Sequence, residues 1–191
     1  GSATAANNTG TGNTAIGWSA LINNTSGVQN TAVGQSALLN NLNAQNNTGI
    51  GSQALSATST GDYNTAVGKS AGQFIDTGAS NTAVGESAIQ GVTGNRLTGA
   101  QNTAVGRAAG LLLQGAAANN TFLGYNAGNT TTTGASNILI GSGIVAPAAT
   151  TSNHLNIGNT IYADMSTDYV GIGTNAPGTK LQINGSFVAD K

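Results

Sequence analysis

Few side chains in this sequence could do chemistry, and those few are widely spaced. The 191 residues include one histidine, no cysteine, five basic and six acidic side chains. A catalytic or metal site needs several such groups close together. His154 has no cysteine partner, and the nearest carboxylate in the sequence, that of Asp164, is ten residues away. The sequence therefore predicts that the protein is not an enzyme and that it holds no metal and no cofactor.

Aromatic and cationic side chains could instead recognise a ligand, because tryptophan, tyrosine and arginine dominate many recognition surfaces. Trp18 is the only tryptophan, and an exposed ring beside amide groups is suited to stacking on a sugar. The same ring could instead cap one end of the fold or pack across an oligomer interface. The candidate ligand-binding residues are Trp18, Arg96, Arg107, Tyr125, Tyr162, Asp164 and Tyr169.

These residues stand out because the rest of the chain is nearly uncharged. Charged residues make up 6% of the sequence and the net charge is −1, whereas globular proteins average roughly 25% charged residues. Five basic side chains cannot supply the phosphate contacts that nucleic-acid binding requires. The longest apolar stretch, 108–118, is interrupted by Gln114 and is too short to span a bilayer. We therefore expect neither a nucleic-acid partner nor insertion of this chain into a membrane.

The elements that must position these side chains follow from an internal repeat. The pentapeptide NTAVG begins at positions 30, 64, 81 and 102, and near-copies begin at 13, 47, 120 and 137. The first four steps are seventeen residues long, the next three are 21, 18 and 17, and a degenerate copy follows at 154–158. A nearly fixed period of this length indicates a stack of similar coils. The sequence predicts an all-β solenoid of about nine coils of seventeen residues.

The repeat unit reads N-T-A-V-G-x-S-A-L, followed by a polar run and often by T-G. We expect T-A-V to form a short strand that ends at the glycine. S-A-L should form a second short strand or a helical turn, and T-G should return the chain. Equivalent residues of stacked coils lie about 4.8 Å apart and form rows. The rows expected to build the scaffold are those of Asn13, Asn30, Asn64, Asn81 and Asn102, of Val33, Val67, Val84 and Val105, and of Gly34, Gly68 and Gly85.

Each row has an expected role. The asparagines should hydrogen-bond amide to amide, as in cross-β ladders. The valine row should be the main apolar stripe, beside an alanine row that runs from Ala20 to Ala127, and the threonine row from Thr14 to Thr121 should be an internal ladder. Large apolar residues are few. The free energy gained by burying them within one chain therefore barely offsets the conformational entropy that the chain loses on folding. We therefore expect an obligate homo-oligomer that shares its apolar stripe between copies.

Recognition is expected where the repeats differ from one another. The position after the strand glycine varies most, and it holds Trp18, Gln35, Ser52, Lys69, Glu86, Arg107 and Tyr125. Lys69, Glu86 and Arg107 alternate in sign, which indicates either a stacked ion-pair ladder or a solvated face without like-charge repulsion. The 21-residue step contains an insertion, 90–101, with Arg96 near its centre. Such an insertion forms either a binding loop or a tolerated surface loop.

The repeat NTAVGxSA, over roughly residues 13–141, resembles the SVAIG-type repeat of YadA-like trimeric autotransporter adhesin heads. It also resembles repeats of phage-type trimeric tail-fibre proteins, and VGIGTNAPGTKLQINGSF at 170–187 resembles segments of tail-fibre-like proteins. The resemblance implies a left-handed parallel β-roll, three chains side by side, and an extracellular place on a bacterial surface or a virion. The seventeen-residue coil is longer than the adhesin repeat, which leaves the cross-section of the roll open.

The expected organisation is a tag and leading segment at 1–12, a repeat β-roll at 13–143, and a small irregular β module or transition segment at 144–191. The expected function is a homotrimeric adhesive fibre segment that presents a surface to a cell-surface glycan or protein receptor. A passive spacer that carries a separate binding domain is the alternative. The regular threonine row also leaves ice binding as a remote third hypothesis.

Overall fold

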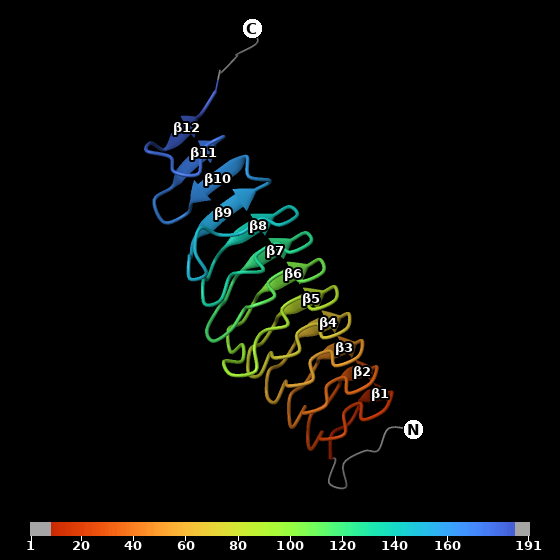
Figure 1. The fold of residues 1–191 in the computed structure, drawn as a ribbon. Coiled ribbons are helices and arrows are strands. Elements are labelled where there is room, and N and C mark those ends of the chain that lie inside the picture. The colour runs from red at the N-terminus through yellow and green to blue at the C-terminus, as the bar shows by residue number, and fades with distance from the viewer. Residues whose placement is uncertain (1–8, 186–191) are drawn as a thin grey trace.

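Residues 9–185 are described by the computed structural model, and they form twelve strands and no helix (Figure 1). The repeats contribute β1 (Thr14–Ile16), β2 (Thr31–Val33), β3 (Thr48–Ile50), β4 (Thr65–Val67), β5 (Thr82–Val84), β6 (Thr103–Val105), β7 (Thr121–Leu123) and β8 (Ile138–Ile140). The remaining strands are β9 (His154–Ile157), β10 (Ile161–Asp164), β11 (Tyr169–Ile172) and β12 (Leu181–Ile183). Positions 1–8 of the predicted leading segment and 186–191 of the predicted C-terminal module lie outside the described residues.

Strands β1 to β9 are consecutive parallel neighbours, so the chain makes eight turns between nine strands. The register matches the repeat, since Thr14 pairs with Thr31 and Ile138 pairs with Leu155. Figure 1 shows the turns stacked into a rod with β1 and β12 at opposite ends. The predicted all-β parallel solenoid is confirmed.

Each three-residue strand of the solenoid turns its middle residue into the coil and its two flanking residues outward, as side-chain alternation requires. Ala32, Ala66 and Ala83 are fully buried, whereas Ile16 is 60% exposed and Val67 is 37% exposed. The valine row, expected to be the main apolar stripe, therefore lies on the outside of the coil, while alanine fills the strand centres. The outward-facing members of this row include Val33, Val67, Val84 and Val105.

The threonine row lies on the same outer side as the valine row. A threonine stands two residues before each valine in T-A-V, so the two side chains share one face of the sheet. Thr14, Thr103 and Thr121 are exposed, and the threonines of the other repeat strands are half-buried. The prediction of an internal threonine ladder is wrong for this reason.

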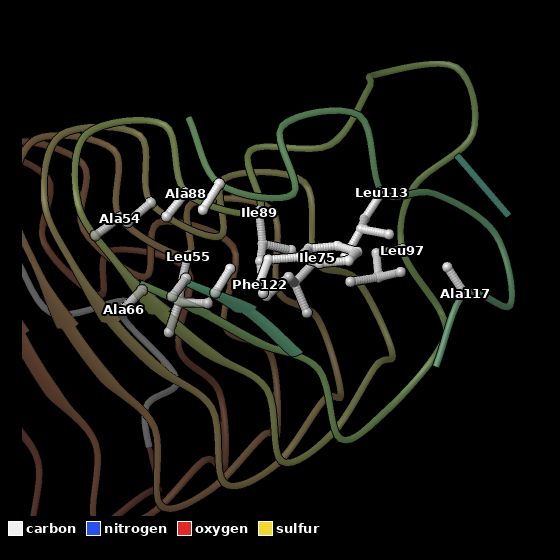
Figure 2. Close-up of a cluster of buried hydrophobic side chains, with 14 of the residues drawn as sticks. Ala54, Leu55, Ala66, Ile75, Ala88, Ile89, Leu97, Leu113, Ala117 and Phe122 are labelled. Carbon is white, nitrogen blue, oxygen red and sulfur yellow. The ribbon is translucent and has the colours of Figure 1, made fainter. Parts of the chain in front are cut away.

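Alanine and leucine fill the narrow interior instead. The alanine row of S-A-L is buried as predicted, from Ala20 to Ala127. The next residue of the repeat adds the larger apolar volume, as with Leu38 and Leu55, which are fully buried. Figure 2 shows Leu55 between Ala54 and Ala66, with Ile75, Leu97 and Phe122 in the same apolar cluster. The core is thus built from small residues with one or two larger side chains in a coil.

The asparagine row closes one corner of every coil. Asn64 shows the pattern: its backbone N–H donates to Asn47 Oδ1 (2.7 Å), and its Nδ2 donates to the carbonyl of Gly78 (2.9 Å). Its own Oδ1 accepts the N–H of Asn81 (2.9 Å) and the Nδ2 of Asn81 (3.1 Å). The predicted amide-to-amide bond is therefore present, and backbone groups are bonded as well.

The S-A-L segment forms neither a strand nor a helix. It is a turn in which the serine and leucine positions adopt left-handed φ, as in Ser36 (55°) and Leu38 (49°). The strand ends at a glycine, as predicted, with a φ of 131° at Gly34. A β-carbon on Gly34 would lie 2.6 Å from the carbonyl oxygen of Gly51, so the coils stack too closely there for any side chain.

The insertion at 90–101 leaves the stack and returns to it. Thr93 to Arg96 are exposed, and Leu97 then re-enters the core and bridges Ile75 and Gly115 in parallel. Leu97 is fully buried, so the loop is fixed at its C-terminal end by apolar packing.

Beyond β9 the same sheet continues, but the chain direction changes. β10 is antiparallel to both β9 and β11, and β12 is parallel to β11. His154 keeps its place in the lattice, because its backbone N–H donates to Asn137 Oδ1 (3.0 Å) as an asparagine of the row would. The parallel stack therefore extends through β9, and the change of topology begins after it.

Candidate functional site

The most extensive feature of the surface is the outer face, which we define as the outward-pointing side chains of β1 to β12. One of its rows, here called the aliphatic row, passes through all twelve strands in register. Its members are Ile16, Val33, Ile50, Val67, Val84, Val105, Leu123, Ile140, Ile157, Ile161, Ile172 and Ile183. Several are strongly exposed, including Ile16 (60%) and Leu123 (47%). With strands about 4.8 Å apart, the row is about 50 Å long.

A second row runs beside the aliphatic row and changes character along the rod. From β1 to β7 it consists of threonine. From β8 onward the register places Ile138, Leu155, Ala163, Val170 and Leu181 in it. The outer face therefore widens from one apolar row to two towards β12, and neither row contains a charged residue. Large contiguous exposed apolar surfaces are typical of interaction sites, so the outer face is a candidate for contact with a partner.

A second cluster lies on the variable row. Arg107 Nε donates to Glu86 Oε2 (3.2 Å), and Arg107 Nη1 donates to the Tyr125 hydroxyl (3.4 Å). The guanidinium carbon lies 5.7 Å from the centre of the Tyr125 ring. The hydrogen bond to Glu86 raises the pKa of the Arg107 guanidinium. Within residues 9–185 Lys69 joins no ion pair, so of the two alternatives for this row a continuous ion-pair ladder is not formed. The one pair present is exposed and adds little stability.

Trp18 and Arg96 lie apart from this cluster. Trp18 is 72% exposed on the first coil, in agreement with its predicted exposure. Arg96 Nη1 lies 3.8 Å from Asp76 Oδ2, and both side chains are partly exposed. Trp18 and Arg96 could therefore each offer a single side chain to a ligand, since in the described part of the chain neither contacts another of the candidate residues.

The three C-terminal candidates are brought together on the sheet face that continues the solenoid interior. Asp164 pairs with both His154 and Tyr169 across the antiparallel strands, and Tyr162 stands two residues before Asp164. The Tyr162 and His154 rings lie 6.4 Å apart between centroids. Hydrogen bonds from Ser166 lower the pKa of the Asp164 carboxyl, and this carboxylate is exposed.

A cavity of about 250 Å³ opens beside these residues. Its lining residues are Val145, Ala146, Pro147, His154, Asn156, Asn159, Tyr162 and Asn175. Of these, only Tyr162 is among the sequence-derived candidates. Asn156 could have been noticed, since it occupies the strand centre where the first eight repeats have alanine, glycine, phenylalanine or leucine. A polar residue at that position marks the end of the apolar interior.

No cluster of three or more histidine, cysteine or carboxylate side chains that could hold a metal ion occurs in the described residues. In the same part of the chain, no helix is long and apolar enough to cross a membrane.

Comparison with known proteins gives no relative: no family model matches the chain, and no curated protein or solved structure matches it.

Proposed function

We propose that the chain is a segment of an extracellular, homotrimeric adhesive fibre. In this arrangement three left-handed rolls lie side by side and parallel, with their outer faces turned towards a common axis. The observation that supports it best is the aliphatic row, which stays aliphatic through twelve strands although each of its members is at least partly exposed in the single chain.

The contrast with the variable row argues for burial of the outer face. A row that faces solvent in every coil can hold any residue, and the variable row does so, from Trp18 through Lys69 and Glu86. The aliphatic row holds only valine, isoleucine and leucine. Since nothing inside the coil contacts these side chains closely enough to bury them, the restriction indicates that a partner covers them.

The best occupant is a second copy of the chain. The aliphatic row repeats with every coil, so a parallel copy presents apolar residues at the same spacing along the full length. The absence of charge from the outer face fits contact between identical surfaces, where any charge would meet its own copy. A row about 50 Å long offers such a copy a continuous line of contact.

Recognition would then use the surfaces that point away from the axis. The Glu86, Arg107 and Tyr125 cluster, the Arg96 loop and the cavity beside Tyr162 all remain available. A fibre segment in which none of these binds a receptor would be a passive spacer, and binding to glycans or to whole cells separates the two roles.

Ice binding is the second candidate, and the outward position of the threonines favours it. Seven threonines stand about 4.8 Å apart beside the aliphatic row, which gives a regular array on an uncharged face. The replacement of threonine by Ile138, Leu155 and Val170 further along the same row favours self-association instead. Thermal hysteresis of a monomeric sample would support ice binding.

The direct test is the solution mass and its response to one outer-face substitution. We expect the unaltered chain to have about three times its mass of 18.6 kDa by light scattering. Val67→Asp would place three carboxylates in the shared apolar interface, where unpaired charges cost several kcal/mol. The dissociation constant should therefore rise by at least about 100-fold, which corresponds to roughly 3 kcal/mol.

Gln35→Asp is the matched control, because it adds the same charge on the exposed variable row. It should leave the mass unchanged. A folded monomer of the unaltered chain, or equal effects of the two substitutions, would overturn the trimer.

A further inference from the structure

The cavity near the C-terminal end is where the interior of the solenoid stops. β9 is the last strand of the parallel stack, and the chain then reverses into β10 instead of completing another coil (Figure 1). The inward positions of β9 are held by His154 and Asn156. The apolar interior thus ends in a polar surface, while Val145 and Pro147 form an apolar wall beside it.

Three polar side chains that line this cavity have no hydrogen-bond partner within residues 9–185. They are the His154 imidazole, the Tyr162 hydroxyl and the side-chain amide of Asn175. By contrast, Asn156 and Asn159 hold each other: Asn156 Nδ2 donates to Asn159 Oδ1 (3.0 Å), and the Asn159 N–H donates to Asn156 Oδ1 (3.0 Å). The cavity therefore combines a fixed amide pair with three groups free to bond a ligand.

The lining selects for a neutral ligand. Amide groups carry no charge, and burial lowers the pKa of His154, which favours the neutral form of its ring. The carboxylate of Asp164, paired with His154 across the strands, would repel an anion. An aromatic ring and an apolar wall suit a ligand with one apolar face, and the amides and hydroxyl suit several ligand hydroxyls.

We propose that this cavity binds one ring of a neutral pyranose sugar. Its volume of about 250 Å³ lies below the roughly 300–1,000 Å³ of clefts that hold drug-sized ligands. The ring stacks against Tyr162 and the Pro147 wall, and its hydroxyls bond the free groups. This proposal rests on the adhesive function above and names the ligand class for it.

The position of the cavity is compatible with trimer formation. His154 and Asn156 lie on the face of β9 opposite to Leu155 and Ile157, which belong to the outer face. Packing of three outer faces about an axis therefore leaves the cavity open to solvent. Sugar binding and trimer formation can be measured separately on one sample.

The test uses the full chain and a panel of methyl glycosides of glucose, galactose, mannose and N-acetylglucosamine, followed by saturation-transfer NMR and titration. We expect at least one neutral glycoside to bind with a millimolar dissociation constant, and methyl sialoside not to bind. Tyr162→Phe removes one hydroxyl and should weaken binding by about 5- to 10-fold, in keeping with loss of one hydrogen bond. Asn175→Ala should have a similar effect.

Tyr63→Phe is the control, because Tyr63 is an exposed tyrosine on the repeat stack. It should leave the affinity unchanged. Absence of binding by all four neutral glycosides at 50 mM, or binding that neither cavity variant weakens, would overturn the sugar site. The mass of the same sample tells the two proposals apart: a trimer without sugar binding rejects only the cavity proposal, and sugar binding by a monomer rejects only the fibre.

Discussion

Replacing Asn64 with leucine should lower the free energy of unfolding by about 3–5 kcal/mol, although leucine is more apolar and of similar size. Asn64 bonds the carbonyl of Gly78 through its Nδ2 and accepts the N–H of Asn81 through its Oδ1. Leucine would leave both backbone groups buried without partners, at about 1–3 kcal/mol each. Urea denaturation at fixed protein concentration measures the loss, since the midpoint of an associating chain depends on its concentration.

A matched substitution at an exposed asparagine tests whether burial causes the loss. Asn23→Leu is the control, because Asn23 also bonds the asparagine of the next coil but is exposed; it should change stability by less than about 0.5 kcal/mol. A loss below 1 kcal/mol in Asn64→Leu would contradict the structural role of the row.

Asn64→Asp keeps the acceptor oxygen but loses the Nδ2 donor and buries a carboxyl group. Burial raises the pKa of that carboxyl above the roughly 3.9 of an unfolded aspartate. The folded variant binds its proton more tightly than the unfolded chain does, so its stability relative to the unaltered protein should rise as the pH falls through the raised value. When protonated, the acid can again donate to the Gly78 carbonyl. Urea midpoints at pH 4 and pH 7 check the sign.

The rows of the solenoid could be predicted from the sequence because each one is written eight times. The repeat period alone assigns Asn64 and Gly34 to their rows. In the structure Asn64 hydrogen-bonds neighbouring coils, and Gly34 ends its strand with a positive φ. The inside and outside of the strands could not be read in the same way. A three-residue strand offers one inward position, and a shift of one residue exchanges the two faces.

Valine is the most apolar residue of T-A-V, but the structure places alanine at the inward position. The coil is narrow, and the leucine of S-A-L already fills much of it. Leu38, for example, lies beside Gly49, the strand centre of the next coil. A β-carbon added to Gly49 would lie 3.3 Å from the Cγ of Leu38. Only small residues fit in most of the strand centres. The valines then face outward, where contacts within the coil do not account for their apolar character.

The candidate site was predictable to a smaller extent. Arg107 and Tyr125 belong to one row, so their proximity follows from the period. The cavity at Tyr162 depends on the reversal of the chain after β9 and on Asn175 returning from beyond β11. Such non-local antiparallel pairing leaves no periodic signal. His154 was assigned to the lattice, and it does lie there, but its side chain also lines the cavity.

Phe122 should be the other residue on which the stability of the rod depends most. It stands at the centre of β7, where most repeats have alanine, and it is fully buried. Figure 2 shows its ring in the middle of the apolar cluster. Phe122→Ala should lower the free energy of unfolding by about 3–5 kcal/mol, because it leaves a cavity that the closely stacked coils cannot collapse. Urea denaturation at fixed protein concentration measures this loss as well.

The room for Phe122 comes from two glycines, Gly110 and Gly128, at the position where the first three coils have leucine. A β-carbon on Gly128 would lie 2.7–2.8 Å from the ring, and one on Gly110 would lie 2.9 Å from it. Gly128→Leu alone should therefore be destabilising by steric overlap, typically by about 1–3 kcal/mol or more. The backbone itself accepts leucine, since Gly128 has a φ of 63° and Leu38 adopts 49° at the equivalent position.

The double variant Phe122→Ala with Gly128→Leu restores the pairing of alanine and leucine that the coil of Ala32 and Leu38 already uses. It should be more stable than either single variant, with a favourable coupling of about 2–3 kcal/mol in the double-mutant cycle. Gly94→Leu serves as a control for the added side chain, because a β-carbon there meets nothing within 4 Å. If the losses of the two single variants simply add, then the ring and the glycine are not compensating partners. In that case the larger side chain at β7 is accommodated by relaxation of the coil instead.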